Sequence, residues 1–231
     1  MGIGSKGQEP LAIALGWPAR GSIWSAYRRA AAVGRELATL ITILRAIDHR
    51  LKIQAIGHSL GARVILTALP HLPPGSLSLA IFLAGAELRG VAQKSLDTPA
   101  GRHLSVLNVV SRENALFDYM LTWLLAPFCF AERALGHGLG TPCSTWVDLA
   151  IHHPTLRRGL SALGYTVPAA SRWLCHWSVY LRPGLFPLYR DVVLGALPLA
   201  QLAALQPKQT KKTRMHNPVL RLLPFRLWHA S

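Results

Sequence analysis

Ser59 is the residue whose surroundings most clearly indicate chemistry, because it is the centre of the pattern Gly-x-Ser-x-Gly over residues 57–61. The segment Leu51–Ile56 before it predicts a short strand, and Ala62–Leu69 after it predicts a helix. A turn this tight between strand and helix strains the serine backbone and lifts its hydroxyl above the strand end. The pattern favours Ser59 as a nucleophile over a serine that only caps a glycine-rich turn.

The residues around Ser59 fit the same interpretation. Side chains at positions 57 and 61 are expected to collide in such a turn, which explains the two glycines. The backbone amide of Leu60 is expected at the N-terminus of the following helix, where developing negative charge is stabilised. Leu60 is therefore the predicted oxyanion-binding residue.

A serine nucleophile needs a base, and in hydrolases with this turn the acid and then the histidine follow the serine along the chain. Eight histidines follow Ser59: His71, His103, His137, His152, His153, His176, His216 and His229. His176 alone falls on a predicted strand near the end of the sheet-forming region, Arg172–Tyr180. We therefore expect His176 to be the base, against the alternative of a structural histidine.

The acid of such a site is expected after the predicted strand Val106–Val110. Two carboxylates are candidates for the acid. Glu113 follows shortly after the strand end, and Asp118 lies about one helical turn further along. Their role would be to hold the histidine tautomer and stabilise the imidazolium. Either could instead be a carboxylate favoured at a helix N-terminus, and the sequence does not choose between the two.

The elements that would position these residues alternate between strand and helix. Further apolar runs predict buried strands at Leu11–Gly16 and Leu79–Ala84. Ser22 is a predicted N-cap for a long helix over Ile23–Ile47. This rhythm is typical of a mostly parallel sheet flanked by helices on both faces.

The domain is expected to span residues 1–200. Residues 115–170 are less regular and are interpreted as a cap or an excursion from the sheet, and Gly184–Leu197 predicts a final helix. The apolar stretch Tyr119–Phe130 could line an acyl pocket, although core or cap packing is the commoner role for such residues. Residues 206–231 form a separate basic tail.

The composition indicates a globular protein, since 51% of the 231 residues are hydrophobic. No run is long enough to predict a membrane span. The three cysteines are too few and too irregularly spaced for a disulfide framework or a zinc site, which favours a reducing cytoplasm. We expect no metal and no organic cofactor.

The formal net charge is +15, and the tail after Asp191 has no acidic residue. A basic excess favours acidic partners, and the tail mixes Lys and Arg with Leu, Phe and Trp, which suits weak contact with an anionic membrane surface. The alternative is a solvated extension. No nucleic-acid-binding motif is present, and no nucleic-acid partner is expected.

Four blocks of sequence resemble a family of bacterial α/β hydrolases, the lipase-like proteins grouped as a domain of unknown function. The blocks carry the Trp-Pro turn with Tyr27 downstream, the serine turn, the acid strand and the histidine, at residues 14–27, 56–64, 107–114 and 175–190. The resemblance implies an α/β-hydrolase fold, with Ser59 and His176 as nucleophile and base. It implies a serine hydrolase that acts on small or lipidic carboxylic esters.

Two departures from the family pattern bear on activity. The family usually carries an aspartate near the positions of Asn114 and Ala115. The family also carries an upstream His-Gly loop for the second oxyanion donor, which we expect to be missing here together with the first strands of the sheet. Loss of one such donor typically lowers the rate by about 10²–10³-fold. The alternative function is therefore a catalytically impaired fragment or a non-enzymatic binding protein.

Overall fold

A computed structural model describes residues 11–206 of the chain. The N-terminal residues 1–10 and the predicted basic tail from residue 207 onward lie outside the described residues. The described part contains one sheet of four strands in the order β1-β2-β3-β4. These are β1 (Gln54–His58), β2 (Leu79–Leu83), β3 (Ser105–Val110) and β4 (Trp146–Ala150). Each neighbouring pair is parallel, which confirms the predicted sheet.

The helices alternate with the strands along the chain. They are α1 (Ile23–Ile47), α2 (Gly61–Ala68), α3 (Arg89–Leu96), α4 (Ala115–Leu125), α5 (Pro154–Ala162), α6 (Ser178–Leu181), α7 (Leu185–Val193) and α8 (Leu199–Ala204). Short 3₁₀ turns occur at η1 (Leu69–His71), η2 (Gly101–His103), η3 (Arg112–Asn114) and η4 (Leu135–His137). The order strand, helix, strand explains why neighbouring strands run parallel.

Two apolar cores cover the two faces of the sheet, as expected for a parallel sheet with alternating side chains. Ala80 and Phe82 of β2 point into the core shared with α1, α2 and α3. Leu79, Ile81 and Leu83 point into the opposite core, shared with α5, α7 and α8. All five residues of β2 are buried, because this strand has a neighbour on both sides and a helix layer on both faces.

Helix α1 has the predicted bounds, and the Ser22 side chain caps it by accepting a hydrogen bond from the Ser25 amide. Small residues dominate its buried positions, which are Ala26, Ala30, Gly34, Ala38 and Ile41. A Cβ at Gly34 would lie 2.0 Å from Thr67 Oγ1 of α2. The small residues therefore let α1 pack closely against the helix that follows Ser59.

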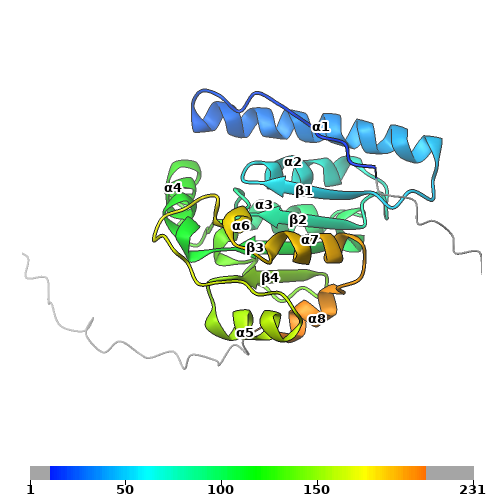
Figure 1. Cartoon of the computed structure of the whole chain (residues 1–231). Helices are drawn as coiled ribbons and strands as arrows, with labels where there is room; N and C mark the ends of the chain where they lie inside the picture. Colours follow the sequence, from blue (N-terminus) through cyan, green and yellow to red (C-terminus); the bar gives the residue numbers. More distant parts are fainter. Residues whose placement is uncertain (1–10, 207–231) are drawn as a thin grey trace, which may run out of the picture.

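The prediction of a buried strand over Leu11–Gly16 is wrong. These residues have no regular structure, and Leu11 is 86% exposed. A strand requires a partner with free ladder hydrogen bonds, and this segment pairs with no described strand. It follows α1 instead (Figure 1), where the Arg29 side chain donates to the carbonyl oxygens of Pro18 and Arg20.

The predicted strand over Arg172–Tyr180 is also wrong. His176 lies in an irregular segment just before the short helix α6. In the described residues β4 is the last strand of the sheet, and residues 172–180 do not pair with it. The amide of Cys175 donates to the carbonyl oxygen of Glu113, in the loop after β3. The final helix predicted over 184–197 is present as α7 but ends at Val193, because Gly195 adopts a positive φ of 77°. The next helix, α8, starts only after Pro198, beyond the predicted range.

The stretch 115–170 contains α4, β4 and α5, so β4 inside it belongs to the sheet. Figure 1 shows α4 and α6 beyond the arrowheads of the strands, at the carboxyl edge where the Ser59 turn also lies. This edge is the usual place for a site in a parallel sheet. Among residues 11–206, no helix has the length and apolar character needed to cross a bilayer.

Candidate functional site

The backbone of Ser59 adopts the left-handed conformation, with φ 52°. A non-glycine residue in this region is strained, and such strain is retained where the surroundings fix it. Two backbone hydrogen bonds do so here: the Ser59 amide donates to Leu83 O at 3.0 Å, and the Ala86 amide donates to Ser59 O at 2.8 Å. Strand β2 and the loop after it therefore hold the turn in its strained form.

The two glycines of the turn differ in what they allow. A Cβ at Gly57 would lie 2.5 Å from the carbonyl carbon of Gly61, so position 57 accepts no side chain. A Cβ at Gly61 would meet no atom within 4 Å. The expectation of a collision is therefore correct for Gly57 and wrong for Gly61, whose side-chain position faces open space.

Leu60 follows Ser59 and precedes the first turn of α2. No side chain caps this helix, and the Leu60 amide donates to no backbone carbonyl among the described residues. A free amide at a helix N-terminus favours negative charge. Leu60 is thus placed where an oxyanion formed beside Ser59 could accept its hydrogen bond.

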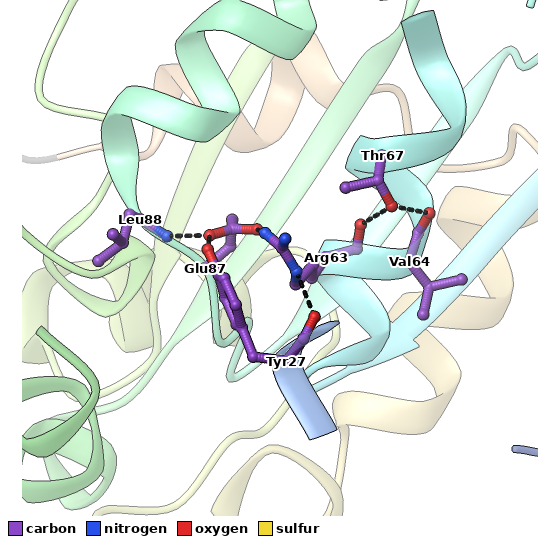
Figure 2. Close-up of polar contacts among 6 residues, drawn as sticks. All are labelled: Tyr27, Arg63, Val64, Thr67, Glu87 and Leu88. Carbon is purple, nitrogen blue, oxygen red and sulfur yellow. Dashed lines mark hydrogen bonds and ion pairs between the residues drawn. The ribbon is translucent and has the colours of Figure 1, made fainter. Parts of the chain in front are cut away.

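A cluster of Tyr27, Arg63 and Glu87 lies behind the Ser59 turn and joins three elements. Figure 2 shows the three side chains directed at one another from α1, α2 and the loop after β2. Arg63 Nη1 donates to Glu87 Oε2 at 2.6 Å, and its guanidinium carbon lies 3.4 Å from the centre of the Tyr27 ring. The Tyr27 hydroxyl and the Leu88 amide both donate to Glu87 Oε1.

This cluster fixes the helix that begins at the nucleophile. Glu87 is completely buried and directly follows Ala86, whose amide binds Ser59 O. Burial raises the pKa of the Tyr27 phenol, and the Glu87 carboxylate raises it further, so Tyr27 acts as a donor. Sequence reasoning did not identify Glu87. A carboxylate shortly after the fully apolar strand β2 was the available signal.

The structure brings His176 to the Ser59 turn although the two are far apart in the sequence. The rings of His58 and His176 lie 4.5 Å apart, centre to centre. His176 Nδ1 lies 2.6 Å from Asn114 Oδ1. No hydrogen bond joins Ser59 Oγ to His176 in the part of the chain that is described. Such contacts often tighten only when substrate binds.

Asn114, and not a carboxylate, therefore contacts the imidazole. Its other amide atom, Nδ2, donates to Asp118 Oδ1 at 3.0 Å. When Asp118 is ionised, its carboxylate can only accept, so the Asn114 oxygen faces His176 and the hydrogen on the imidazole is at Nδ1. His176 Nε2 is then free to accept a proton, which is the tautomer that a serine nucleophile needs.

Asp118 is buried, and burial raises the pKa of its carboxyl to about 7, while the hydrogen bond from Asn114 acts in the opposite direction. Gly136 lies against this carboxyl, where a Cβ would come within 1.9 Å of Asp118 Oδ2. Asp118 thus accepts a hydrogen bond from Asn114, and in residues 11–206 no hydrogen bond joins it to His176.

Glu113 forms a buried ion pair with Arg182 and not with His176, and each side chain of the pair is only 5% exposed. Ser111 Oγ also donates to Glu113 Oε2, at 3.0 Å. Burial acts to raise the pKa of Glu113, but the hydrogen bonds from Arg182 and Ser111 outweigh it, and the pKa lies below its ordinary value. The pair ties the loop after β3 to the segment that follows His176.

His176 itself is half-buried among rings. Phe117 lies 4.9 Å from it and Trp177 lies 5.7 Å away, measured between ring centres. Burial, and then the neighbouring His58 ring, lower the pKa of His176 to about 4. The imidazole is therefore neutral and able to accept a proton at neutral pH. Among residues 11–206, no three His, Cys, Asp or Glu side chains converge as a metal site.

Comparison with known proteins identifies a family over one part of the chain. Residues 3–76 match the family described as "Alpha/beta hydrolase of unknown function (DUF900)". The matched segment includes α1, β1 and the Ser59 turn, and it ends before Glu87. The match confirms the resemblance to an α/β-hydrolase family and agrees with the parallel sheet flanked by helices. No curated protein and no solved structure matches the chain significantly.

Proposed function

Because the chain matches an α/β-hydrolase family, we propose that it is a serine hydrolase of carboxylic esters, with Ser59 as nucleophile and His176 as base. The meeting of His176 with the strained Ser59 turn carries this proposal, through the 4.5 Å contact between the rings of His58 and His176. The family match supports a hydrolase. The ester specificity and the roles of the residues are our proposal.

The reaction begins when His176 Nε2 takes the proton of Ser59 Oγ as this oxygen attacks the ester carbonyl carbon. The carbonyl oxygen becomes an oxyanion and accepts a hydrogen bond from the Leu60 amide. The C–O bond to the alcohol then breaks, and His176 gives the proton to the leaving oxygen. Water, deprotonated by His176, attacks the acyl-enzyme, and the acid leaves as Ser59 recovers its proton.

The residue that orients His176 in this mechanism is Asn114. Its oxygen holds the Nδ1 hydrogen, and Asp118 acts through Asn114 by fixing the direction of the amide. Of the two carboxylates expected as the acid, Asp118 is thus a positioning residue one step removed, and Glu113 supports the loop through Arg182. An amide stabilises an imidazolium less than a carboxylate does.

A catalytically impaired hydrolase, or a binding protein on this fold, is the second candidate function. The observation that favours it is the same Asn114 contact, since within residues 11–206 no carboxylate hydrogen-bonds to His176 and the pKa of the imidazole is lowered to about 4. A weakly basic histidine accepts the serine proton less readily. The two candidates differ in turnover and share the same geometry.

A cytoplasmic location is also part of the proposal. Cys129, Cys143 and Cys175 are all free cysteines, and Cys129 is exposed. Free, exposed thiols are usual in a reducing compartment. Fractionation of the source cells with an antibody to the full chain would test this, and recovery from the periplasm or the medium would contradict it.

The proposed activity is tested by hydrolysis of p-nitrophenyl esters with acyl chains of increasing length. The full chain is compared with Ser59→Ala and with Ser144→Ala, a control that removes an exposed serine elsewhere. We expect kcat/KM to fall by on the order of 10³-fold or more for Ser59→Ala and to be unchanged for Ser144→Ala. Equal rates for Ser59→Ala and the native chain would reject the hydrolase and leave the second candidate.

A further inference from the structure

Helix α4 and the segment after it expose an unusual number of large apolar side chains. Of the eleven residues of α4, only Asp118 and Leu121 are buried. Tyr119 is 67% exposed, Trp123 62% and Phe128 93%. The predicted acyl-pocket stretch, Tyr119–Phe130, is therefore largely a surface. Such a concentration of exposed aromatic residues marks an interaction site.

Exposed rings also occur around His176, just before α6 and on α7. A chain of ring contacts leads from Phe117 to His176 at 4.9 Å and from His176 to Trp177 at 5.7 Å. Tyr180 then stacks on Phe186 at 6.2 Å. Trp177 is 56% exposed and Phe186 60%. The half-buried base therefore contacts α4 through Phe117 and lies beside the exposed ring of Trp177, just before α6. We call the exposed aromatic residues of α4, of the segment after it, and of the segment 177–186 together the His176 surface: Phe117, Tyr119, Trp123, Phe128, Trp177 and Phe186.

Exposed basic side chains border the His176 surface. In residues 111–131 and 166–186 the carboxylates are Glu113 and Asp118, and both are buried. The next carboxylate along the chain, Glu132, accepts hydrogen bonds from the amides of Gly90 and Arg133. Arg112, directly before α4, and Arg172, four residues before His176, are exposed. A surface of Trp, Tyr and Phe bordered by exposed arginines complements the interface of an anionic bilayer. Two copies of this chain would instead bring like charges together.

We propose that the His176 surface docks on an anionic phospholipid membrane and presents Ser59 and His176 to it. The substrate class that follows is an ester whose acyl chain is embedded in the lipid. This inference rests on the proposed function for its substrate class, whereas the docking itself requires no catalysis. The tail, which also favours anionic lipid by its composition, is a separate contribution that the test must distinguish.

The test measures co-sedimentation of the full chain with phosphatidylcholine vesicles, with and without phosphatidylglycerol. The variant Trp123→Ser/Phe128→Ser removes two exposed rings, and Ile47→Ser/Leu194→Ser is the matched control because these residues are also exposed, at 76% and 56%. Lys211→Gln/Lys212→Gln reduces the charge of the tail. Ser59→Ala separates docking from catalysis.

The proposal expects binding to anionic vesicles that weakens by about tenfold or more in Trp123→Ser/Phe128→Ser, since each ring adds apolar burial. Binding should be unchanged in Ile47→Ser/Leu194→Ser and in Ser59→Ala. A native chain that binds the vesicles but hydrolyses no ester would reject the proposed function and leave the docking proposal standing. Three results would overturn the docking proposal. In the first, the native chain does not bind vesicles. In the second, binding is lost in Lys211→Gln/Lys212→Gln but not in Trp123→Ser/Phe128→Ser. In the third, the native chain is a dimer in solution that does not bind vesicles, and Trp123→Ser/Phe128→Ser makes it a monomer.

Discussion

The nucleophile side and the base side of the site are built by different means. Behind Ser59, Glu87 is completely buried and accepts hydrogen bonds from Tyr27, Arg63 and the Leu88 amide. Beside His176, the orienting group is the neutral amide of Asn114, and the surrounding rings are exposed. One side is thus held by a buried charge with full hydrogen bonding, and the other by a single amide on an apolar surface.

This difference predicts that the site is rigid around Ser59 and able to change its hydrogen bonding around His176. A buried, fully paired carboxylate tolerates no rearrangement, because an unpaired partner would be costly. An amide held by a carboxyl whose pKa is about 7 can change its hydrogen bonding near neutral pH. The geometry of Ser59 should therefore be insensitive to pH, whereas the basicity and tautomer of His176 should respond to it.

Removing the base should give the largest effect. His176→Ala is expected to slow reaction of Ser59 with a fluorophosphonate by on the order of 10³–10⁴-fold, because the serine loses its proton acceptor. The side chain is only half-buried, so the fold should remain. The rate of labelling, beside the exposed control His71→Ala, measures this. Equal labelling of His176→Ala and the native chain would remove His176 from the site.

Breaking either buried ion pair should lower stability on both sides of the site. Glu87→Gln and Glu113→Gln leave Arg63 or Arg182 without its carboxylate, and each is expected to reduce the free energy of unfolding by about 3–5 kcal/mol. Urea unfolding checks this, with Asp48→Asn as a control whose partner Arg50 is exposed. Wild-type stability in Glu87→Gln would show that the cluster behind Ser59 contributes little.

Changing the orienting amide should act on His176 alone. Asn114→Leu removes the acceptor for the Nδ1 hydrogen and is expected to slow labelling by about 10²–10³-fold. Asn114→Asp keeps an acceptor, and Asp118, whose pKa is already raised, takes the proton that two adjacent carboxyls share. Asn114→Asp should therefore label at least as fast as the native chain. Slower labelling of Asn114→Asp than of Asn114→Leu would contradict the assigned role.

The pH dependence should give the smallest effect on rate. The labelling rate is expected to rise about tenfold between pH 6 and pH 8, as Asp118 ionises with its pKa of about 7. His176, whose pKa is about 4, stays neutral over this range. Asp118→Asn should flatten the profile because position 118 no longer titrates. An unchanged rise in Asp118→Asn would assign the titration to another group.

Asp118→Asn should also change stability, and stability depends on pH in the opposite direction to the labelling rate. The pKa of Asp118 is raised in the folded protein from 3.8 to about 7, so the folded state holds the proton more tightly than the unfolded state. Stability therefore falls as the pH rises from about 4 through 7. Asp118→Asn should raise the free energy of unfolding at pH 8, by at most about 4 kcal/mol, and have little effect at pH 4.

Local patterns predicted the half of the fold that contains the nucleophile. The Ser22 cap, the length of α1 and the strand–turn–helix around Ser59 each depend on residues close together in sequence. The run Leu11–Gly16 is just as apolar as a strand, but a strand also requires a partner, which hydropathy cannot show. The same limit explains the wrong strand over Arg172–Tyr180.

The base side was less predictable because its contacts are long-range. Glu113 forms its ion pair with Arg182, which lies 69 residues later in the sequence. His176 contacts Asn114, which lies 62 residues earlier. Asn114 and Asp118 stand four residues apart at the start of α4, a spacing that brings side chains together on a helix. That spacing identifies the pair, but an amide in place of the acid is not indicated by the Ser, acid, His order of such hydrolases.

The most direct test of the central claim is to react the full chain with a fluorophosphonate at pH 8 and to map the adduct by mass spectrometry. The account predicts a single adduct on the peptide that contains Ser59, lost in Ser59→Ala and slowed in Asn114→Leu. A folded chain that forms no adduct at Ser59, or that labels equally in Asn114→Leu, would contradict a site in which Asn114 and His176 activate this serine.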